Sequence, residues 1–430
     1  MAEPPNWLNL DHVWLPYAQM ADAPPPLPVV GAQGVRLHLA DGTALIDGIS
    51  SWWTACHGYQ HPHIVAAMQR QAAQLSHVMF AGLAHEPAYT LAARLAARLP
   101  GDLDHVFFSE SGSVAVEIAL KMALQYWRNR DQPQRRGVLA FRHGYHGDTF
   151  MAMAVTDPAL GMHDAFCGIV PPALLAELPR DAATSAAFDA LLEREAPRLA
   201  AVIVEPLVQG AGGLRMHDAA TLARVRKACD KHGLLLIADE IMTGFGRTGS
   251  LFACTQADVV PDIVCLSKAL TAGTLPLAAT VARQHVFAAF LGSEFERALM
   301  HGPTYMANAL ACAAANASLD LFAREPRLAQ VAAVAAQLER ELAPCRALPG
   351  VVDVRVKGAI GVVELAAPAA GLRPAFVERG VWLRPFGNVV YVMPPFVIDA
   401  ADLSTLTSAI VDVVAAWSRA QPAVDSRDVV

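Results

Sequence analysis

The stretch LLLIADE at residues 234–240 decides the fold class, because an apolar run ends there in two neighbouring carboxylates. A short continuous apolar run predicts a buried strand. In open α/β sheets, ligands bind at the carboxyl ends of the strands, which is where Asp239 and Glu240 fall. Burying an acid is costly unless it has a partner. The stretch therefore indicates a ligand site, although an aspartate that only caps the following loop would give the same pattern.

Similar apolar runs recur on both sides of this stretch, separated by amphipathic helices. The candidate strands lie at residues 105–109, 137–141, 201–205, 262–267 and 277–282, and the clearest helices at 113–130 and 218–233. This alternation predicts an α/β fold with a mostly parallel central sheet flanked by helices. We expect residues 65–308 to form this large domain.

The two ends of the chain are expected to build a smaller α+β domain. Residues 1–64 contain a hairpin signal at Asp41 and Gly42 and would contribute to both this domain and the active site. Residues 309–430, a mixture of helix and strand patterns, would supply the rest of it. A chain of 430 residues is long enough for two such units.

Composition excludes several classes of function. The net charge is −7 and no basic cluster is present, which argues against nucleic-acid partners and anionic membrane surfaces. Hydrophobic residues make up 54% of the chain, but no apolar run is long enough to span a membrane. The seven cysteines form no C-x-x-C pair, and no export signal is visible, so we expect a soluble cytoplasmic protein with reduced thiols that binds small molecules.

A lysine follows the next buried strand along the chain. Lys268 in DIVCLSKAL comes 29 positions after Asp239, since 268 minus 239 is 29. An amine at the edge of an apolar site is pushed toward its neutral form, as a lysine that forms a Schiff base requires. Alone, a lysine in this position is usually a solvated side chain. Paired with a carboxylate able to hold a pyridinium nitrogen protonated, it predicts pyridoxal phosphate chemistry.

The cofactor's phosphate would need a cradle. In FFSESGSVAVEIALK, a predicted strand is followed by Ser111, Gly112 and Ser113 and then by a predicted helix. The first backbone N–H groups of such a helix are free to bind a phosphate. The same pattern also fits an ordinary helix N-cap. In FRHGYHGDTF, Tyr145 is suited to lie on a flat ring. His143 and His146 suggest a metal only weakly, because no third ligand is evident; we expect no metal and assign them to loop hydrogen bonds.

Together these motifs resemble the class III aminotransferases, which are fold-type I enzymes dependent on pyridoxal 5'-phosphate, over about residues 7 to 418. The Ser-Lys and Asp-Glu motifs are family-wide. More specific segments point to the branch of this family that acts in biotin synthesis: DGISSWWTACHGYQHP (47–62), HVMFAGLAHEPA (77–88), MHDAFCGI (162–169), EPLVQGAGG (205–213), CLSKALTAGTLPLAAT (265–280), HGPTYMANALACAAANASL (301–319) and GVWLRPFGNVVYVMPP (380–395).

The resemblance implies a role for each cofactor residue. Lys268 would bind the cofactor as a Schiff base and carry the proton that moves during the reaction. Asp239 would bind the pyridine nitrogen, Tyr145 would lie on the ring, and Gly112 with Ser113 would hold the phosphate. From the HGPT segment, Gly302, Pro303 and Thr304 would reach the site across a subunit interface, so a homodimer with shared active sites is expected.

The resemblance also implies a substrate pocket. Trp52 and Trp53 would form an apolar wall with Tyr17 for a long aliphatic chain. Neighbours in a regular strand point to opposite faces, so both rings can contribute only if the backbone is irregular there. Arg384 would pair with a substrate carboxylate, and Tyr391 would lie at the same end. Arg247 in GFGRTG would help to bind either substrate, or would be a surface loop charge.

The expected reaction is a ping-pong transamination. It would convert 8-amino-7-oxononanoate into 7,8-diaminononanoate, with S-adenosyl-L-methionine as amino donor. The sequence leaves lysine open as an alternative donor. It also leaves open another class III ω-aminotransferase and, outside enzymes, a non-catalytic cofactor-binding module. The last alternative fits poorly, because Lys268 and Asp239 are both present.

Overall fold

The computed structural model describes residues 5–160, 162–166, 168–369 and 371–421, so the extreme ends of the two predicted terminal segments lie outside it. Its centre is a seven-stranded sheet. In spatial order the strands are β4 (Leu103–Ser109), β12 (Ala278–Arg283), β11 (Ile263–Leu266), β10 (Leu235–Asp239), β7 (Leu199–Val204), β5 (Gly137–Phe141) and β6 (Leu174–Ala176). Only β12 runs against its neighbours, which confirms the mostly parallel sheet predicted from the sequence.

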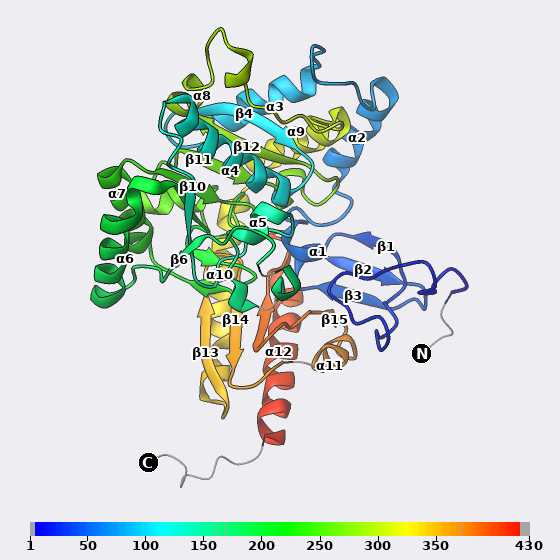
Figure 1. Cartoon of the computed structure of the whole chain (residues 1–430). Helices are drawn as coiled ribbons and strands as arrows, with labels where there is room; N and C mark the ends of the chain where they lie inside the picture. Colours follow the sequence, from blue (N-terminus) through cyan, green and yellow to red (C-terminus); the bar gives the residue numbers. More distant parts are fainter. Residues whose placement is uncertain (1–4, 161, 167, 370, 422–430) are drawn as a thin grey trace.

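Both faces of this sheet are buried, as the continuous apolar runs require. On β10, Leu235 and Ile237 pack in one hydrophobic cluster, while Leu236 and Ala238 pack in the other. The long helix α4 (Gly112–Asn129) covers the first face with an apolar stripe. The other helices around the sheet are α2 (Pro62–Gln74), α3 (Glu86–Ala96), α5 (Phe150–Ala154), α6 (Ala182–Glu195), α7 (Ala219–His232) and α8 (Gln284–Ala288), with α6 and α7 grouped at the left of Figure 1.

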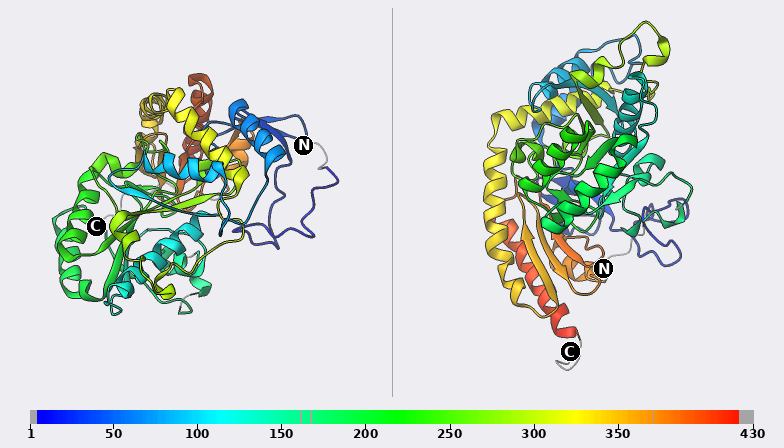
Figure 2. Two further views of the ribbon diagram at one scale, coloured as in Figure 1. Left: turned by 90° about the horizontal axis from the view of Figure 1, so that it is seen from above. Right: turned by 60° about the vertical axis from the view of Figure 1, so that its left-hand side comes forward.

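The C-terminal residues that are expected to form most of the smaller domain lie below the large sheet in Figure 1. They form an antiparallel sheet of β13 (Val351–Val356), β14 (Gly361–Leu365) and β16 (Val389–Val392), with helices α10 (Arg327–Leu342), α11 (Arg373–Val377) and α12 (Ala400–Ala420). Helix α9 (Ala309–Arg324) packs on α2 and α3, and α10 then runs down one side of the molecule to the smaller sheet (Figure 2).

The N-terminal segment forms a sheet of its own, which one C-terminal strand completes. Strands β1 (Val29–Gln33), β2 (Arg36–Leu39) and β3 (Ala44–Asp47) are antiparallel neighbours, and β15 (Val381–Trp382) pairs with β3 in parallel. The predicted hairpin at Asp41 and Gly42 is confirmed, since it joins β2 to β3. A four-residue segment, α1 (Ser50–Trp53), begins three residues after the end of β3. Strand β8 (Val208–Gln209) pairs with β9 (Arg215–Met216).

Helix α12 is long and apolar enough to cross a membrane by composition alone. It packs against α10 and α11, and its buried side includes Leu403, Leu406 and Ile410. A helix with one apolar face against a sheet and its helices is an ordinary core element.

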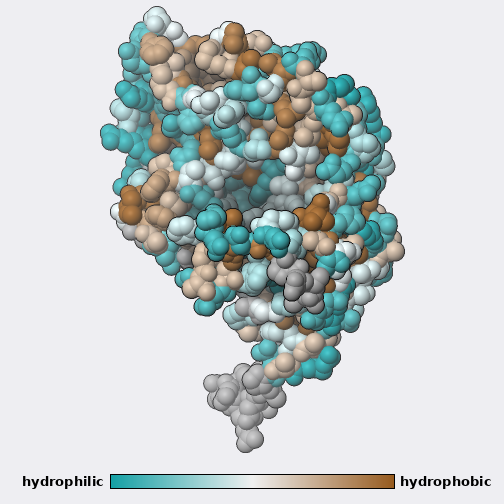
Figure 3. All heavy atoms as spheres, turned by 90° about the vertical axis from the view of Figure 1, so that its right-hand side faces the viewer, coloured by the Kyte–Doolittle hydropathy of each residue, from teal (hydrophilic) through white to brown (hydrophobic). Residues whose placement is uncertain are grey.

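On the face drawn in Figure 3, hydrophobic and hydrophilic residues are interspersed, as on most protein surfaces.

Candidate active site

The sheet brings the two decisive residues together. Strands β10 and β11 are parallel neighbours with Asp239 opposite Cys265, so the chain leaves both strands on the same edge, where Asp239 and Lys268 lie. A cavity of about 170 Å³ opens at this edge. Its lining includes the predicted residues Lys268, Asp239, Tyr145, Gly112, Ser113 and Trp53.

Lys268 is held with its amine inside the cavity wall. It begins a short 3-10 turn, Lys268–Thr271, and its backbone has a positive φ of 44°. Burial lowers the pKa of Lys268 to about 8, against the opposing attraction of the Asp239 and Glu205 carboxylates. The Nζ atom lies 4.2 Å from the centre of the Trp53 ring. The amine is therefore far easier to deprotonate than that of a solvated lysine.

Asp239 is anchored on both oxygens. Its Oδ1 accepts a hydrogen bond from the backbone N–H of Ile241 at 3.1 Å, and its Oδ2 lies 2.7 Å from Nδ1 of His146. The prediction that His146 serves a loop hydrogen bond is thus wrong for its side chain, which pairs with the cavity carboxylate. Among the residues that the structure describes, no group of three or more His, Cys, Asp or Glu side chains could hold a metal ion.

Glu205 is a second cavity carboxylate that the sequence reasoning did not single out. It follows β7 directly, next to β10, and accepts hydrogen bonds from the backbone N–H groups of Tyr145 at 3.0 Å and Gly210 at 2.8 Å. Burial raises the pKa of Glu205 to about 7. Glu205 could have been predicted, because it ends an apolar run in the same way as Asp239 does.

The start of α4 forms one end of the cavity. Ser111 is an ordinary N-cap whose Oγ accepts from the backbone N–H of Val114 at 3.3 Å, while Gly112 and Ser113 line the cavity. Ser113 Oγ also accepts from the backbone N–H of Asp148 at 3.1 Å. A Cβ on Gly147 would fall 2.2 Å from that Oγ, so only glycine lets this loop close on the helix start.

The hydroxyl of Tyr145 belongs to a polar cluster at the mouth of the cavity. Tyr145 donates to Oδ1 of Asp148 at 3.0 Å, and Tyr17 donates to Oδ2 at 2.5 Å. Nε2 of His163 lies 2.9 Å from Oδ1 of the same carboxylate. Burial opposes the effect, but these hydrogen bonds lower the pKa of Asp148. Asp148 and His163 were not predicted, because their pairing depends on three separate loops.

The paired tryptophans lie on a left-handed turn. Ser50, Ser51, Trp52 and Trp53 have φ values of 50°, 45°, 66° and 74°. Left-handed backbone costs roughly 1–2 kcal/mol per residue for side chains other than glycine. The expectation of an irregular backbone is confirmed, and the two rings do separate. Trp53 is 5% exposed beside Lys268, whereas Trp52 is 40% exposed.

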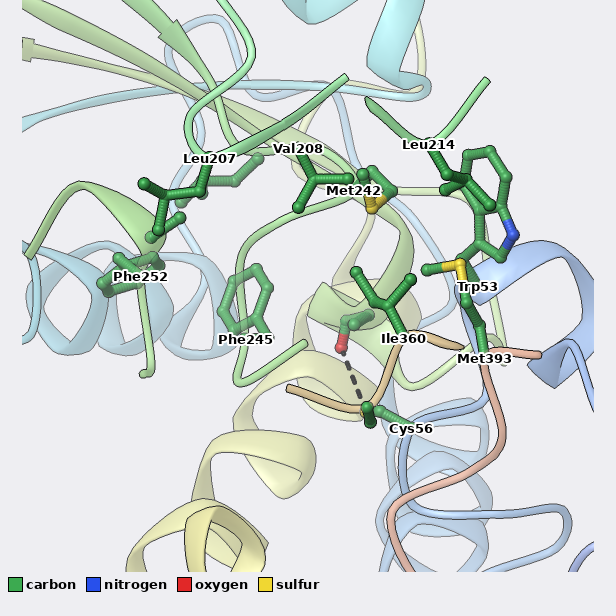
Figure 4. Close-up of a cluster of buried hydrophobic side chains, with 14 of the residues drawn as sticks. Trp53, Cys56, Leu207, Val208, Leu214, Met242, Phe245, Phe252, Ile360 and Met393 are labelled. Carbon is green, nitrogen blue, oxygen red and sulfur yellow. Dashed lines mark hydrogen bonds between the residues drawn. The ribbon is translucent and has the colours of Figure 1, made fainter. Parts of the chain in front are cut away.

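Trp53 is fixed by the core behind it. It lies beside Leu214 and Met393 in the buried cluster shown in Figure 4. The ring of Tyr391 lies edge-on to it with centroids 6.3 Å apart. Tyr391 is itself 1% exposed, and burial raises its pKa to about 12. Tyr391 is not among the residues that line the cavity. It packs against the Trp53 ring instead.

Trp52 faces a second, larger groove of about 870 Å³. Tyr17 and Arg384 line the same groove, together with other residues of the N-terminal segment. The Tyr17 and Trp52 rings are 6.1 Å apart, and the Arg384 guanidinium carbon lies 4.8 Å from the Trp52 ring centre. Three of the predicted substrate residues therefore meet at one place, with a cation at the end of an apolar surface.

Arg247 lies elsewhere. It is 1% exposed, so a surface loop charge is the wrong interpretation. Its guanidinium donates to the carbonyl oxygens of Pro394 at 2.8 Å and Ala359 at 3.2 Å. Burial lowers the pKa of Arg247 to about 10. Because these bonds are made to the chain itself, the predicted contact of Arg247 with substrate has no support in this arrangement.

The predicted phosphate residues of the HGPT segment are also outside the cavity of this chain. Gly302 and Thr304 are exposed and Pro303 is partly exposed, and the described lining of the cavity contains none of the three. Their contribution to the site stays a prediction that requires a second chain.

Comparison with known proteins agrees with this geometry. The family model described as "Aminotransferase class-III" matches residues 17–414. A Mycobacterium leprae protein named adenosylmethionine-8-amino-7-oxononanoate aminotransferase is 48% identical, with 94% of this chain and 95% of that protein covered. The crystal structure of a protein of the same name from Methanocaldococcus jannaschii has a TM-score of 0.90 at 32% identity, covering 94% and 96% of the two chains.

An (S)-enantioselective omega-transaminase from Thermomicrobium roseum is similar in structure as well. Its TM-score is 0.87 at 30% identity, with 94% of this chain and 96% of that chain covered. Backbone similarity alone therefore does not separate these activities. The matched family model spans the Asp239 and Lys268 strands, the helix start at Gly112 and the tryptophan turn alike. With its cavity residues and nearly its whole length accounted for, the chain belongs to the class-III aminotransferases.

Proposed function

We propose that this enzyme transfers an amino group from S-adenosyl-L-methionine to 8-amino-7-oxononanoate, giving the 7,8-diaminononanoate of biotin synthesis. The observation that carries the proposal is the two-part site. A buried chamber at Lys268 adjoins, through Trp53 and Trp52, an apolar groove with Arg384 at its side. An apolar wall beside a guanidinium suits a long aliphatic chain ending in a carboxylate. The names of the relatives support the same substrates.

Class-III aminotransferases depend on pyridoxal 5'-phosphate, and the cavity residues fit it. Three features of the cavity fit this cofactor: the Lys268 amine with its lowered pKa, the buried Asp239 carboxylate, and a helix start that a side chain at position 147 would obstruct. Lys268 would hold the cofactor covalently, Asp239 would hold its ring nitrogen protonated, and Gly112 with Ser113 would hold its phosphate. When bound, this cofactor would carry the amino group between the two substrates and would accept the electron pair that stays on the substrate when its proton is removed.

The protein's own groups would bind substrate and move protons. Lys268 Nζ would remove the α-proton of the donor and return a proton to the acceptor, and its lowered pKa near 8 matches that task. Asp239 is held by Ile241 and His146. Trp53 covers the amine and keeps water away from it. Arg384 would pair with the carboxylate of the acceptor.

The proposal is tested with single-turnover absorbance measurements. The cofactor-loaded protein is mixed separately with S-adenosyl-L-methionine, lysine and a simple ω-amine, and the absorbance of the resting cofactor is followed. Loss with S-adenosyl-L-methionine alone, reversed by 8-amino-7-oxononanoate, is expected. Loss only with the other amines would keep the aminotransferase and reject the substrates, as for the omega-transaminase relative. No change with any amine would favour a cofactor-binding module.

The proposal includes a cytoplasmic homodimer with shared active sites. The exposed positions of Gly302 and Thr304, away from this chain's cavity, support a contribution to a partner's site. The six cysteines that the structure describes are free and buried, in accord with a reducing compartment. Mixing Lys268→Ala protein with Thr304→Ala protein tests the shared site, because mixed dimers would carry one intact site and regain activity. No gain on mixing would contradict it.

A further inference from the structure

The left-handed turn that carries the two tryptophans is held by a buried carboxylate outside the cavity. Asp47 ends strand β3 and is completely buried. Its Oδ1 accepts from the backbone N–H of Ile49 at 2.9 Å, and its Oδ2 accepts from the backbone N–H of Ser51 at 2.8 Å. The two bonds bracket Ser50, the first residue of the turn.

Tyr59 closes the same arrangement from the other side. Its hydroxyl donates to Oδ2 of Asp47 and lies 2.5 Å from the Oγ of Ser51. The Oγ of Ser50 donates to the carbonyl oxygen of Met393 at 2.7 Å. Both serine hydroxyls of the turn are thus hydrogen-bonded, and Asp47 accepts from the backbone N–H groups on either side of Ser50.

An ionised carboxylate suits this position better than any other side chain of its size. It offers two acceptor oxygens and no donor, so it satisfies both N–H groups and the tyrosine hydroxyl. An asparagine has only one acceptor oxygen and would turn its NH₂ group toward one of these donors. A run of positive φ values in residues other than glycine persists only where the surroundings fix it.

The turn sets the direction of both indole rings. Trp53 follows Ser51 by two residues and lies against Lys268, while Trp52 lies between Tyr17 and Arg384. If the turn relaxed toward a right-handed one, the two side chains would leave these partners. Neither Asp47 nor Tyr59 lines the described cavity at Lys268 or the groove at Arg384.

We infer that Asp47, with Tyr59, is a positioning residue that fixes the tryptophan wall and so determines affinity for the long-chain acceptor. This inference rests on the proposed function, because it takes 8-amino-7-oxononanoate as the molecule that lies along Trp52. It concerns substrate affinity rather than chemistry. Asp47 makes no hydrogen bond to Lys268, Asp239 or the helix start at Gly112, so cofactor binding is expected to be retained.

The test compares the cofactor-loaded variants Asp47→Asn and Tyr59→Phe with the unaltered protein. We expect KM for 8-amino-7-oxononanoate to rise about tenfold or more in Asp47→Asn and by a smaller factor in Tyr59→Phe, since small misplacements of positioning groups have large effects. The affinity for pyridoxal 5'-phosphate, measured by fluorescence titration of the cofactor-free proteins, is expected to change less than about twofold, because Asp47 donates or accepts no hydrogen bond at Asp239 or at the start of α4. The near-ultraviolet circular dichroism of the tryptophans is expected to change in parallel with KM.

The matched control is Asp181→Asn. Asp181 also accepts from a backbone N–H, that of Thr184 at 2.8 Å, but it caps the exposed start of α6. Its KM and tryptophan signal are expected to be unchanged. Unchanged KM and unchanged tryptophan signal in both Asp47→Asn and Tyr59→Phe would overturn the inference, and if Asp47→Asn fails to fold, Tyr59→Phe alone decides in the same way.

The same experiment distinguishes a failure of the proposed function from a failure of the role inferred for Asp47. If the unaltered protein does not turn over 8-amino-7-oxononanoate, the proposed function fails. The tryptophan dichroism of the two variants then still shows whether Asp47 and Tyr59 hold the turn. A loss of cofactor affinity in Asp47→Asn as large as the loss of affinity for the acceptor would assign the residue to general folding and overturn the positioning role.

Discussion

The Nδ1 atom of His146 lies 2.7 Å from Oδ2 of Asp239, and both side chains are almost completely buried. The pair fixes the direction of the carboxylate toward the cavity, because the second oxygen is also bound, by the backbone of Ile241. The Asp239 carboxylate therefore has a single orientation relative to the cavity. That rigidity is what electrostatic support of a protonated ring nitrogen requires.

The first prediction concerns the charge of this carboxylate. We expect Asp239→Asn to keep the fold and the cofactor yet to lose roughly 10²-fold or more in kcat, because a neutral amide cannot support a protonated pyridine. Steady-state kinetics and far-ultraviolet circular dichroism are the measurements. Asp218→Asn, at the N-cap of α7, is the control for the substitution itself. A normal rate in Asp239→Asn would rule out the assigned role.

The second prediction concerns pH. Burial lowers the pKa of Lys268 to about 8, so its amine is protonated below that pH and neutral above it. Only the neutral amine reacts with an aldehyde, so covalent attachment of pyridoxal phosphate to the cofactor-free protein is expected to speed up by about tenfold between about pH 7 and pH 9 and then level off. Stopped-flow absorbance follows the reaction.

A companion variant checks the cause of this pKa. The Glu205 carboxylate raises the pKa of Lys268, so Glu205→Gln is expected to move the plateau to lower pH. A rate that keeps rising well above pH 9, as for an ordinary lysine with a pKa of about 10.4, would contradict the buried amine.

The third prediction concerns the closure of the loop on the start of α4. In Gly147→Ala, the new methyl group would meet Ser113 Oγ at 2.2 Å and Ser113 Cα at 2.8 Å, so Ser113 must move away from the cavity. Cofactor affinity is expected to fall by about tenfold or more. Gly42→Ala is the control, because Gly42 also has a positive φ, of 85°, but its methyl group would meet no atom within 4 Å. Equal affinities in the two variants, measured by fluorescence titration, would refute the clash.

The fourth prediction concerns the substrate carboxylate. Arg384→Ala is expected to raise KM for 8-amino-7-oxononanoate by roughly 10- to 100-fold, the range for loss of a hydrogen bond to a charged group. Arg384→Lys is expected to restore little, since lysine lacks the planar fork that stacks on Trp52. Arg373→Ala changes another arginine of the same groove and serves as the control. Steady-state kinetics with the acceptor decide, and an unchanged KM in Arg384→Ala would remove this arginine from the site.

Sequence reasoning reached the large sheet and the cofactor side of the site. Asp239 ends an apolar run that predicts a buried strand, Lys268 follows another, and parallel neighbouring strands end at the same edge of the sheet. Glu205 obeyed the same rule and was overlooked, although its strand was predicted. These residues can be predicted because the apolar run that marks each of them lies directly beside it in the chain.

The substrate side was less predictable, because its geometry depends on contacts between distant segments. Nothing in the letters SSWW shows a left-handed turn, since its handedness comes from Asp47, Tyr59 and Met393. Asp148 and His163 join Tyr17 only after three loops meet. Arg247 was misjudged for the same reason: its partners, Ala359 and Pro394, lie more than a hundred residues further along the chain.

The pairing of β3 with β15 joins Ile46 to Val381, and Gly48 is hydrogen-bonded to both Trp382 and Met393. A ribosome makes the whole seven-stranded sheet, which ends at Arg283, well before it reaches those C-terminal residues. Domains tend to fold as units while synthesis proceeds, and closing so long a loop must wait for its far end. A nascent chain can therefore form the edge of the sheet that carries Asp239 and Lys268 first, and it acquires its tryptophan wall only when translation is nearly finished.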